Sequence, residues 1–436
     1  MRDIIYNSNI RASVLSMLNV FIKMVVSLVT VPITIKCFGS EMYGVWAAAL
    51  SIMTFVNFLD AGLTPTILNK LSIAFSNKDK KAFKESYIMG VYVGIIVLII
   101  TFIFTILLGK INFTSILNLS YKIDNIEVVR LFQIVLITTG LVISTSIFEN
   151  IYFSINRGDI PRIISIIFNI LGLILIVFIS KFNKSILILA LAIQLPKFIY
   201  RFILAIYIYK FTDVKLLPFQ KINIKYVKEL FNTSSKFVFI QVFNWLYSSA
   251  ASFIIPRQIG LQEFTDFTIL FTPFNIILTI IASFQPIFWP KFLESFHYGK
   301  FKDLKNYMYN NIKFSSIFLM FFIIIYMLFG PIFIKIYSNN SVSFNYLISI
   351  NFSIWLLIQS QIWWLSTFFH GIQDLIFEII SFGLSALSLI TISYLFGNEL
   401  NINRYSVIMW TSIVIFNLIP MYIRFNNKLD IRNEKG

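Results

Sequence analysis

Twelve long apolar segments divide this chain, and no other feature restricts its fold so strongly. They cover residues 11–38, 43–74, 86–109, 126–153, 160–180, 186–210, 231–257, 264–290, 307–334, 346–369, 375–396 and 405–424. A helix needs about 20 apolar residues to cross the hydrocarbon core of a bilayer. The runs are continuous and lack the period-two alternation of a membrane β-barrel. The sequence therefore predicts an all-α integral membrane protein with twelve transmembrane helices.

The composition excludes several other classes of protein. Of the 436 residues, 58% are hydrophobic and 13% are charged, whereas a soluble domain is about half apolar and about a quarter charged. A soluble enzyme and a disordered chain are therefore excluded, and the single Cys37 excludes a disulfide-stapled scaffold. The first apolar segment is too long for a signal peptide, so we expect it to stay in the mature protein.

Basic residues are distributed unequally between the two sides of the predicted membrane. If both termini lie in the cytoplasm, 25 of the 36 Lys and Arg residues fall on the inner side and 9 on the outer side. Short cytoplasmic loops carry such an excess of basic residues. This distribution explains the net charge of +16 without a nucleic-acid partner. The sequence predicts cytoplasmic termini.

The two halves of the sequence resemble each other at an offset of about 221 residues. At this offset, Gly39, Pro65, Lys81, Lys84 and Asn118 align with Gly260, Pro286, Lys302, Lys305 and Asn339, and at an offset of 224 Pro196 aligns with Pro420. Each half contains six segments, so we expect a pseudo-two-fold axis along the membrane normal. The predicted domains are an N-terminal lobe (1–210), a cytoplasmic linker (211–230) and a C-terminal lobe (231–436). Coincidence within a biased composition is the alternative.

Several cations fall inside the predicted membrane segments of the first lobe. Lys23 shares one helix face with Asn19 and with the hydroxyl side chains of Ser16 and Ser27. Lys197 lies in mid-segment, and Arg201 is one helical turn away. A charge at mid-bilayer costs at least about 2.5 kcal/mol, so such residues face water, an anion or each other. Lys23, Lys197, Arg201 and Asn19 are therefore the predicted binding residues.

Five further ionisable residues are candidates for lining the cavity or for ion coupling: Asp60, Glu149, Arg257, Asp266 and Glu378. Two alternatives to a binding role remain. The cations of the first lobe could pair internally with Glu149 or Asp60, and Arg201 and Arg257 could extend toward the membrane surface.

No pattern of enzyme residues is present. The two histidines, His297 and His370, do not belong to an H-E-x-x-H motif, and the sequence has no G-x-x-x-x-G-K-[ST] phosphate-binding loop. We expect a protein without catalytic activity, cofactor or metal.

The N-terminal region carries motifs of a known family. They comprise Asn9, Pro32, the turn F-G-S-E-M-Y-G-V-W at 38–46, and L-D-A-G-L at 59–63. The chain resembles the Wzx-type polysaccharide transporters (O-antigen and capsule flippases) of the multidrug/oligosaccharidyl-lipid/polysaccharide exporter (MOP) superfamily. The motifs cover chiefly residues 9–75, and the agreement in topology covers the whole chain. Ala61 departs from the D-L-G-L form of many relatives.

This resemblance implies a MATE-like fold with two six-helix lobes around a cavity that opens alternately to each side. The substrate would be an oligosaccharide on an undecaprenyl-diphosphate-type lipid, moved across the bacterial cytoplasmic (inner) membrane. Cations such as Lys23 and Lys197 suit a diphosphate. Polysaccharide polymerase and ligase partners are expected, with a monomeric transporter.

Three alternatives remain open. A drug exporter of the same superfamily would favour an acidic, apolar cavity, against which the mid-segment lysines argue. A lipid II flippase would have fourteen spans. A membrane-embedded glycosyltransferase or polymerase would need a large extramembrane loop, and no loop here exceeds about twenty residues.

Overall fold

The computed structural model describes residues 2–60, 63–119, 123–155, 157–182, 185–208, 224–297, 299–372 and 374–433. Within these ranges the chain is helical and contains no strand, which confirms the predicted all-α class. The chain divides into two compact units, Met1–Gln241 and Val242–Gly436. Most of the predicted linker lies outside the described residues, so its role stays a prediction.

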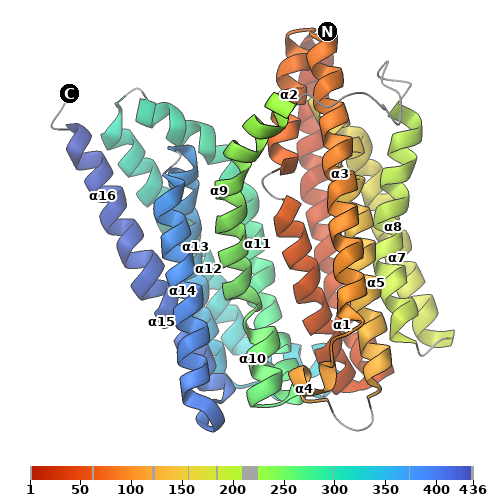
Figure 1. The fold of residues 1–436 in the computed structure, drawn as a ribbon. Helices are drawn as coiled ribbons and strands as arrows, with labels where there is room; N and C mark the ends of the chain where they lie inside the picture. Colours follow the sequence, from red (N-terminus) through yellow and green to blue (C-terminus); the bar gives the residue numbers. More distant parts are fainter. Residues whose placement is uncertain are drawn as a thin grey trace. The chain divides into compact units, whose positions relative to one another are not determined.

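The first unit is a bundle of long helices joined by short connections (Figure 1). Helix α1 packs on α7, α3 packs on α5, and α8 packs on both α5 and α7. The helices of this unit are α1 (Arg2–Asp60), α2 (Leu63–Ser76), α3 (Lys80–Leu108), α4 (Phe113–Leu117), α5 (Asn125–Ser144), α6 (Ser146–Ser154), α7 (Asp159–Phe182) and α8 (Ile186–Tyr207). Helix α9 (Ile224–Ser249) crosses the boundary between the units.

The second unit is also a helical bundle, in which α13 packs on α11, α12 and α15. Its elements are α10 (Ala251–Gln258), α11 (Leu261–His297), α12 (Phe301–Tyr337), α13 (Tyr346–Gly371), α14 (Leu375–Phe396), the 3-10 turn η2 (Gly397–Glu399), α15 (Ile402–Ile413), the π-helical turn η3 (Val414–Leu418) and α16 (Ile419–Asn433).

Among the described residues, ten helices are long and apolar enough to cross a membrane. The first two predicted segments fall in α1 and α2, and α1 itself consists of two helices that meet at the non-helical backbone of Gly39 and are counted as a single span. The tenth predicted segment corresponds to α13, which is not among the ten. Polar residues, including Asn351, Gln359 and Gln361, lower the hydropathy of α13. These two elements account for the difference between the predicted and observed counts.

Large apolar side chains cover the outside of several helices. On α12, Phe314, Leu328 and Ile336 are 76%, 68% and 72% exposed. Soluble monomers rarely expose contiguous apolar surfaces of this extent. Such a surface requires a hydrocarbon environment, as expected of a multi-pass membrane protein.

Residues matched by the internal repeat share positive φ angles. Gly39 and Gly260 both have positive φ values, 82° and 148°, and each lies at a break between consecutive helices. Asn118 and Asn339 also have positive φ values, 49° and 53°, which are uncommon outside glycine. The agreement at sites of unusual geometry supports a duplication, because shared apolar composition alone does not generate it.

Candidate functional site

The first unit contains a cluster of charged side chains from α1, α6, α7 and α8. Lys23 of α1 is exposed, and no hydrogen bond or ion pair joins its ammonium to a described residue. Its charge nevertheless interacts with those of Glu149, Arg162 and Arg201. Lys23 is therefore part of this cluster while its ammonium remains available to a ligand.

The second lysine of the cluster lies on α8. The Nζ of Lys197 donates a hydrogen bond to Oε1 of Gln194 at 3.1 Å, and the side chain is half-buried. Lys197 repels both Lys23 and Arg201 electrostatically. The three cations predicted from the sequence are therefore close together in the folded unit, and a neutral amide is the hydrogen-bond partner of Lys197.

Glu149 of α6 provides the carboxylate of the cluster. Its Oε2 lies 3.1 Å from Nη2 of Arg201 and accepts a hydrogen bond of 3.0 Å from the hydroxyl of Tyr200. Its Oε1 lies 3.4 Å from Nη1 of Arg162. Arg201 also donates to the backbone carbonyl of Val142. Arg201 therefore forms the internal ion pair that the sequence left open as an alternative to ligand binding.

The cluster has more positive than negative charge. Lys23, Arg162, Lys197 and Arg201 bring four cations to the single carboxylate of Glu149, an excess of three among the described side chains. Like charges held close together repel one another, and an anion relieves that repulsion. The arrangement is suited to a multiply charged anion such as a diphosphate.

Asn19 is placed differently from the two lysines. It is 2% exposed, its Nδ2 lies 3.3 Å from Oγ of Ser165, and its Oδ1 accepts a hydrogen bond of 2.9 Å from Asn169. These contacts join α1 to α7, as polar side chains do between membrane helices. The side chain of Asn19 therefore contributes to the packing of α1 against α7.

The remaining predicted residues have other surroundings or lie outside the described part of the chain. The side chain of Asp60 lies outside the described residues. Arg257 is exposed on α10, and Asp266 of α11 accepts a hydrogen bond of 3.1 Å from Gln262. Glu378 of α14 is fully buried, with Oε2 at 3.0 Å from Nε2 of His370. The last three residues belong to the second unit.

Sequence reasoning missed Arg162, Gln194 and Tyr200. The charge count used Arg162 only as a basic residue of the inner side, whereas in the structure it lies in the first turn of α7 with Nη1 at 3.4 Å from Oε1 of Glu149. The sequence did contain a signal for the pairing of Arg162 with Glu149, because α6 and α7 are joined by a short connection. Charges that flank such a turn come close together when consecutive helices pack. Gln194 and Tyr200 carry no comparable signal, since uncharged polar residues are common in membrane helices.

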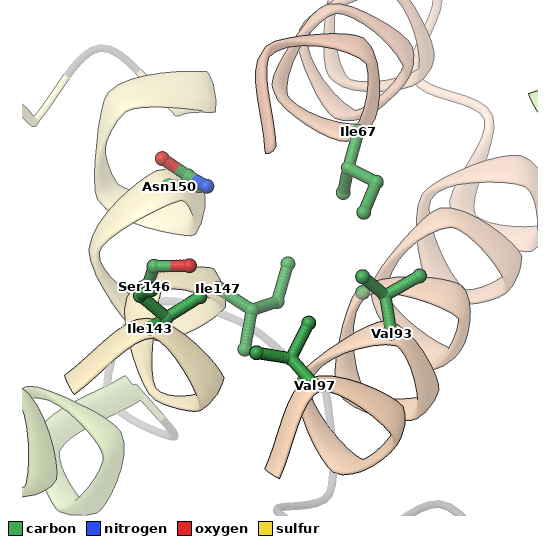
Figure 2. Close-up of a pocket in the computed structure, with 9 residues that line it drawn as sticks. Ile67, Val93, Val97, Ile143, Ser146, Ile147 and Asn150 are labelled. Carbon is green, nitrogen blue, oxygen red and sulfur yellow. The ribbon is translucent and has the colours of Figure 1, made fainter. Parts of the chain in front are cut away.

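A small cavity lies between α2, α3, α5 and α6 (Figure 2). Asn150 and Ser146 lie on one side of it, and Ile67, Val93 and Val97 lie opposite. Its interior admits roughly one water molecule. This cavity is therefore too small for a sugar or a phosphate group.

The described residues contain no group of three His, Cys, Asp or Glu side chains arranged to hold a metal ion. The cluster around Glu149 presents ammonium and guanidinium groups, which recognise negative charge.

The sequence profile of a family described as "Polysaccharide biosynthesis protein" matches residues 11–292. No curated protein sequence matches the chain.

Solved structures with a similar fold are transporters. An inward-facing multidrug-resistance MATE transporter of the MOP superfamily matches with a TM-score of 0.72 and 15% identity, over 94% of this chain and 95% of its own. An outward-facing MATE transporter matches with a TM-score of 0.65 and 14% identity, over 98% and 97%. A MOP transporter from Pyrococcus furiosus, described by the reverse polarity of its binding pocket, matches with a TM-score of 0.68 and 14% identity, over 98% and 95%.

Proposed function

Since the chain belongs to the polysaccharide biosynthesis protein family and has the fold of MOP-superfamily transporters, we propose that it is a flippase for lipid-linked oligosaccharides. Its substrate would be an O-antigen or capsule repeat unit on an undecaprenyl-diphosphate-type lipid. The protein would move this unit from the inner to the outer leaflet of the bacterial cytoplasmic membrane, with both of its own termini in the cytoplasm.

The observation that carries this proposal is the excess positive charge around Glu149. Lys23 and Lys197 have no carboxylate bound to their ammonium groups among the described residues. A diphosphate supplies the missing negative charge, and charge-assisted hydrogen bonds from an ammonium to a phosphate oxygen are short and strong. Lys23 and Lys197 are therefore the proposed diphosphate-binding residues.

Arg201 has a different role in this proposal. Its guanidinium already contacts Glu149, Tyr200 and the Val142 carbonyl, so few of its donors remain for a ligand. The network holds α8 against α5 and α6 and thereby fixes the position of Lys197, one turn before Arg201. Arg201 and Glu149 are positioning residues, and Asn19 acts through the packing of α1 against α7.

Transport would proceed by alternating access, with the protein opening to one side of the membrane at a time. A diphosphate bound by Lys23 and Lys197 would accompany the sugar across, while the polyprenyl tail stays in lipid. Polysaccharide polymerase and ligase enzymes would receive the product, and the transporter would work as a monomer.

A MATE-like exporter of small molecules is the second candidate, because the solved structures with this fold include multidrug transporters. The cluster opposes the export of organic cations by the first unit, because like charges repel them. Anionic drugs would be compatible with the same cluster. A substrate comparison therefore distinguishes the candidates.

The test combines a cell assay with a reconstituted one. Deletion of the gene should abolish surface polysaccharide while lipid-linked repeat units accumulate on the inner leaflet. The purified protein in liposomes should move a fluorescent polyprenyl-diphosphate oligosaccharide between leaflets, but not an organic cation dye. Normal surface polysaccharide in the deletion strain, together with dye export, would favour the second candidate.

A further inference from the structure

Helix α12 extends well beyond the hydrocarbon core of a membrane. It has 37 residues, which span about 55 Å at 1.5 Å per residue, against a core of about 30 Å. Apart from the tyrosines Tyr307 and Tyr309, its exposed large apolar side chains begin at Phe314 and continue to Ile336. The preceding part, residues 301–313, therefore lies at the level of the lipid headgroups and the water beyond them.

The N-terminal part of α12 has one buried face and one basic face. Phe301, Leu304, Met308 and Ile312 are buried against the rest of the unit. Lys302, Lys305 and Lys313 are exposed. The only acidic side chain between residues 301 and 313 is that of Asp303. The solvent-facing side of this segment is therefore cationic.

The basic face continues the lipid-facing surface of the same helix. Lys302 and Met320 are 18 positions apart, which is about five helical turns, so they point in the same direction. Lys313 lies about three turns after Lys302, close to the same line. Met320 is 49% exposed among the apolar residues that face hydrocarbon. The lysines thus project from the protein where the headgroups of the surrounding lipids lie.

Two tyrosines in this segment provide a separate indication of the headgroup level. Tyr307 and Tyr309 are 46% and 43% exposed. Tyrosine is enriched at membrane–water interfaces, where its ring contacts the acyl region and its hydroxyl contacts polar groups.

The same feature recurs in the first unit. Lys81 and Lys84, which the internal repeat aligns with Lys302 and Lys305, are exposed in the first turns of α3. Helix α3 then continues into exposed apolar residues such as Ile96 and Ile99. Both units therefore begin an apolar, lipid-facing helix with exposed lysines.

We propose that the N-terminal part of α12 binds the headgroups of anionic phospholipids through Lys302, Lys305 and Lys313, with Tyr307 and Tyr309 at the same interface. Charge complementarity identifies the ligand, since each basic residue near an anionic membrane surface contributes to attraction. The site belongs to the lipid-facing surface of the second unit, whereas the Lys23–Lys197 cluster belongs to the first unit. Binding of these headgroups would hold the N-terminal part of α12 at the membrane surface and so fix the depth of the helix in the bilayer.

The experiment measures lipid binding to the purified full chain in neutral detergent by native mass spectrometry. The probes are phosphatidylglycerol and phosphatidylcholine with matched acyl chains. The wild-type protein should bind phosphatidylglycerol more tightly. The Lys302→Gln, Lys305→Gln, Lys313→Gln triple variant should lose about fivefold in phosphatidylglycerol affinity per lysine, with phosphatidylcholine binding unchanged.

Lys335→Gln is the matched control, because Lys335 is an exposed lysine at the other end of the same helix. It should retain wild-type affinity for phosphatidylglycerol. Equal affinity of the wild type for the two lipids, or equal losses in the triple and control variants, would overturn the proposal. If the triple variant does not fold, the single Lys302→Gln and Lys313→Gln variants provide the same comparison.

Discussion

Arg201 of α8 and Glu149 of α6 form an ion pair with 3.1 Å between Nη2 and Oε2, and their side chains are only 18% and 9% exposed. Residues 52 positions apart are thereby joined inside the first unit. Removing one partner of a buried pair leaves an uncompensated charge, which costs more than the pair itself contributes. Arg201 is thus bound to a carboxylate of the fold, whereas no described carboxylate binds the ammonium of Lys23 or Lys197.

Arg201→Ala should destabilise the protein by about 3–5 kcal/mol, because among the described residues it leaves the buried Glu149 with Arg162 as its one cationic partner at ion-pair distance. The measurement is the thermal transition and the yield of folded protein in detergent. Adding Glu149→Gln should restore part of the loss. Arg157→Ala is the control, since the side chain of Arg157 is 44% exposed and its ion pair with Asp159 should contribute at most about 1 kcal/mol. Equal losses in Arg201→Ala and Arg157→Ala would contradict the structural role.

Lys23→Ala and Lys197→Ala should reduce transport of a diphosphate-linked substrate at least tenfold while folded protein stays near the wild-type amount. Neither ammonium is bound to a described carboxylate, so its removal should not leave an unpaired buried anion. Lys→Arg variants should retain part of the activity, because the positive charge remains. The measurement is flipping in liposomes, with membrane abundance measured in parallel. Full transport by the Lys23→Ala, Lys197→Ala double variant would exclude the binding role.

Gly94→Ala should destabilise the first unit by about 1–3 kcal/mol. A Cβ at Gly94 would lie 2.5 Å from the backbone oxygen of Ser144, so α3 and α5 would have to separate. Gly172→Ala is the matched control, since its Cβ would meet Pro196 at an ordinary 3.6 Å. Because alanine favours helix over glycine, the control should be neutral or slightly stabilising. Thermal unfolding in detergent distinguishes the two variants, and similar transitions would show that α3 and α5 can separate at little cost.

Single cysteines should reveal the orientation in the membrane. In a Cys37→Ser background, cysteines at positions 80 and 221 should resist an impermeant thiol reagent in intact cells, and one at Asn340 should react. The reason is the positive-inside distribution of lysines and arginines. Lys80 and Asn340 are exposed in the structure, so access to the reagent depends on the side of the membrane. Labelling at position 221 from outside would disprove the twelve-span topology.

Much of the fold could be predicted from the sequence alone. Continuous apolar segments predict membrane helices, because a backbone in hydrocarbon must satisfy its hydrogen bonds within the helix. The repeat that aligns Asn118 with Asn339 was readable as a pattern, and the matched positive φ values agree with it. Gly39, whose φ of 82° and ψ of 166° are not helical, divides α1 at the place where the sequence predicts a break between the first two apolar segments.

The candidate site was predictable only in part. The cost of a charge in hydrocarbon marked Lys23, Lys197 and Arg201 from the sequence, since that cost depends on residue type and depth. Which cation is neutralised depends on distances between helices that sequence spacing does not determine. The packing of α6, α7 and α8 brings Arg201 and Arg162 within ion-pair distance of Glu149. Within α8, Lys197 has the neutral amide of Gln194 as its partner. The packing of α1 on α7 buries Asn19 against Asn169. Hydrophobicity is a property of each segment, so the sequence alone determines which segments enter the membrane. Charge pairing requires particular atoms within about 3 Å of each other, so only the tertiary structure determines which charges pair.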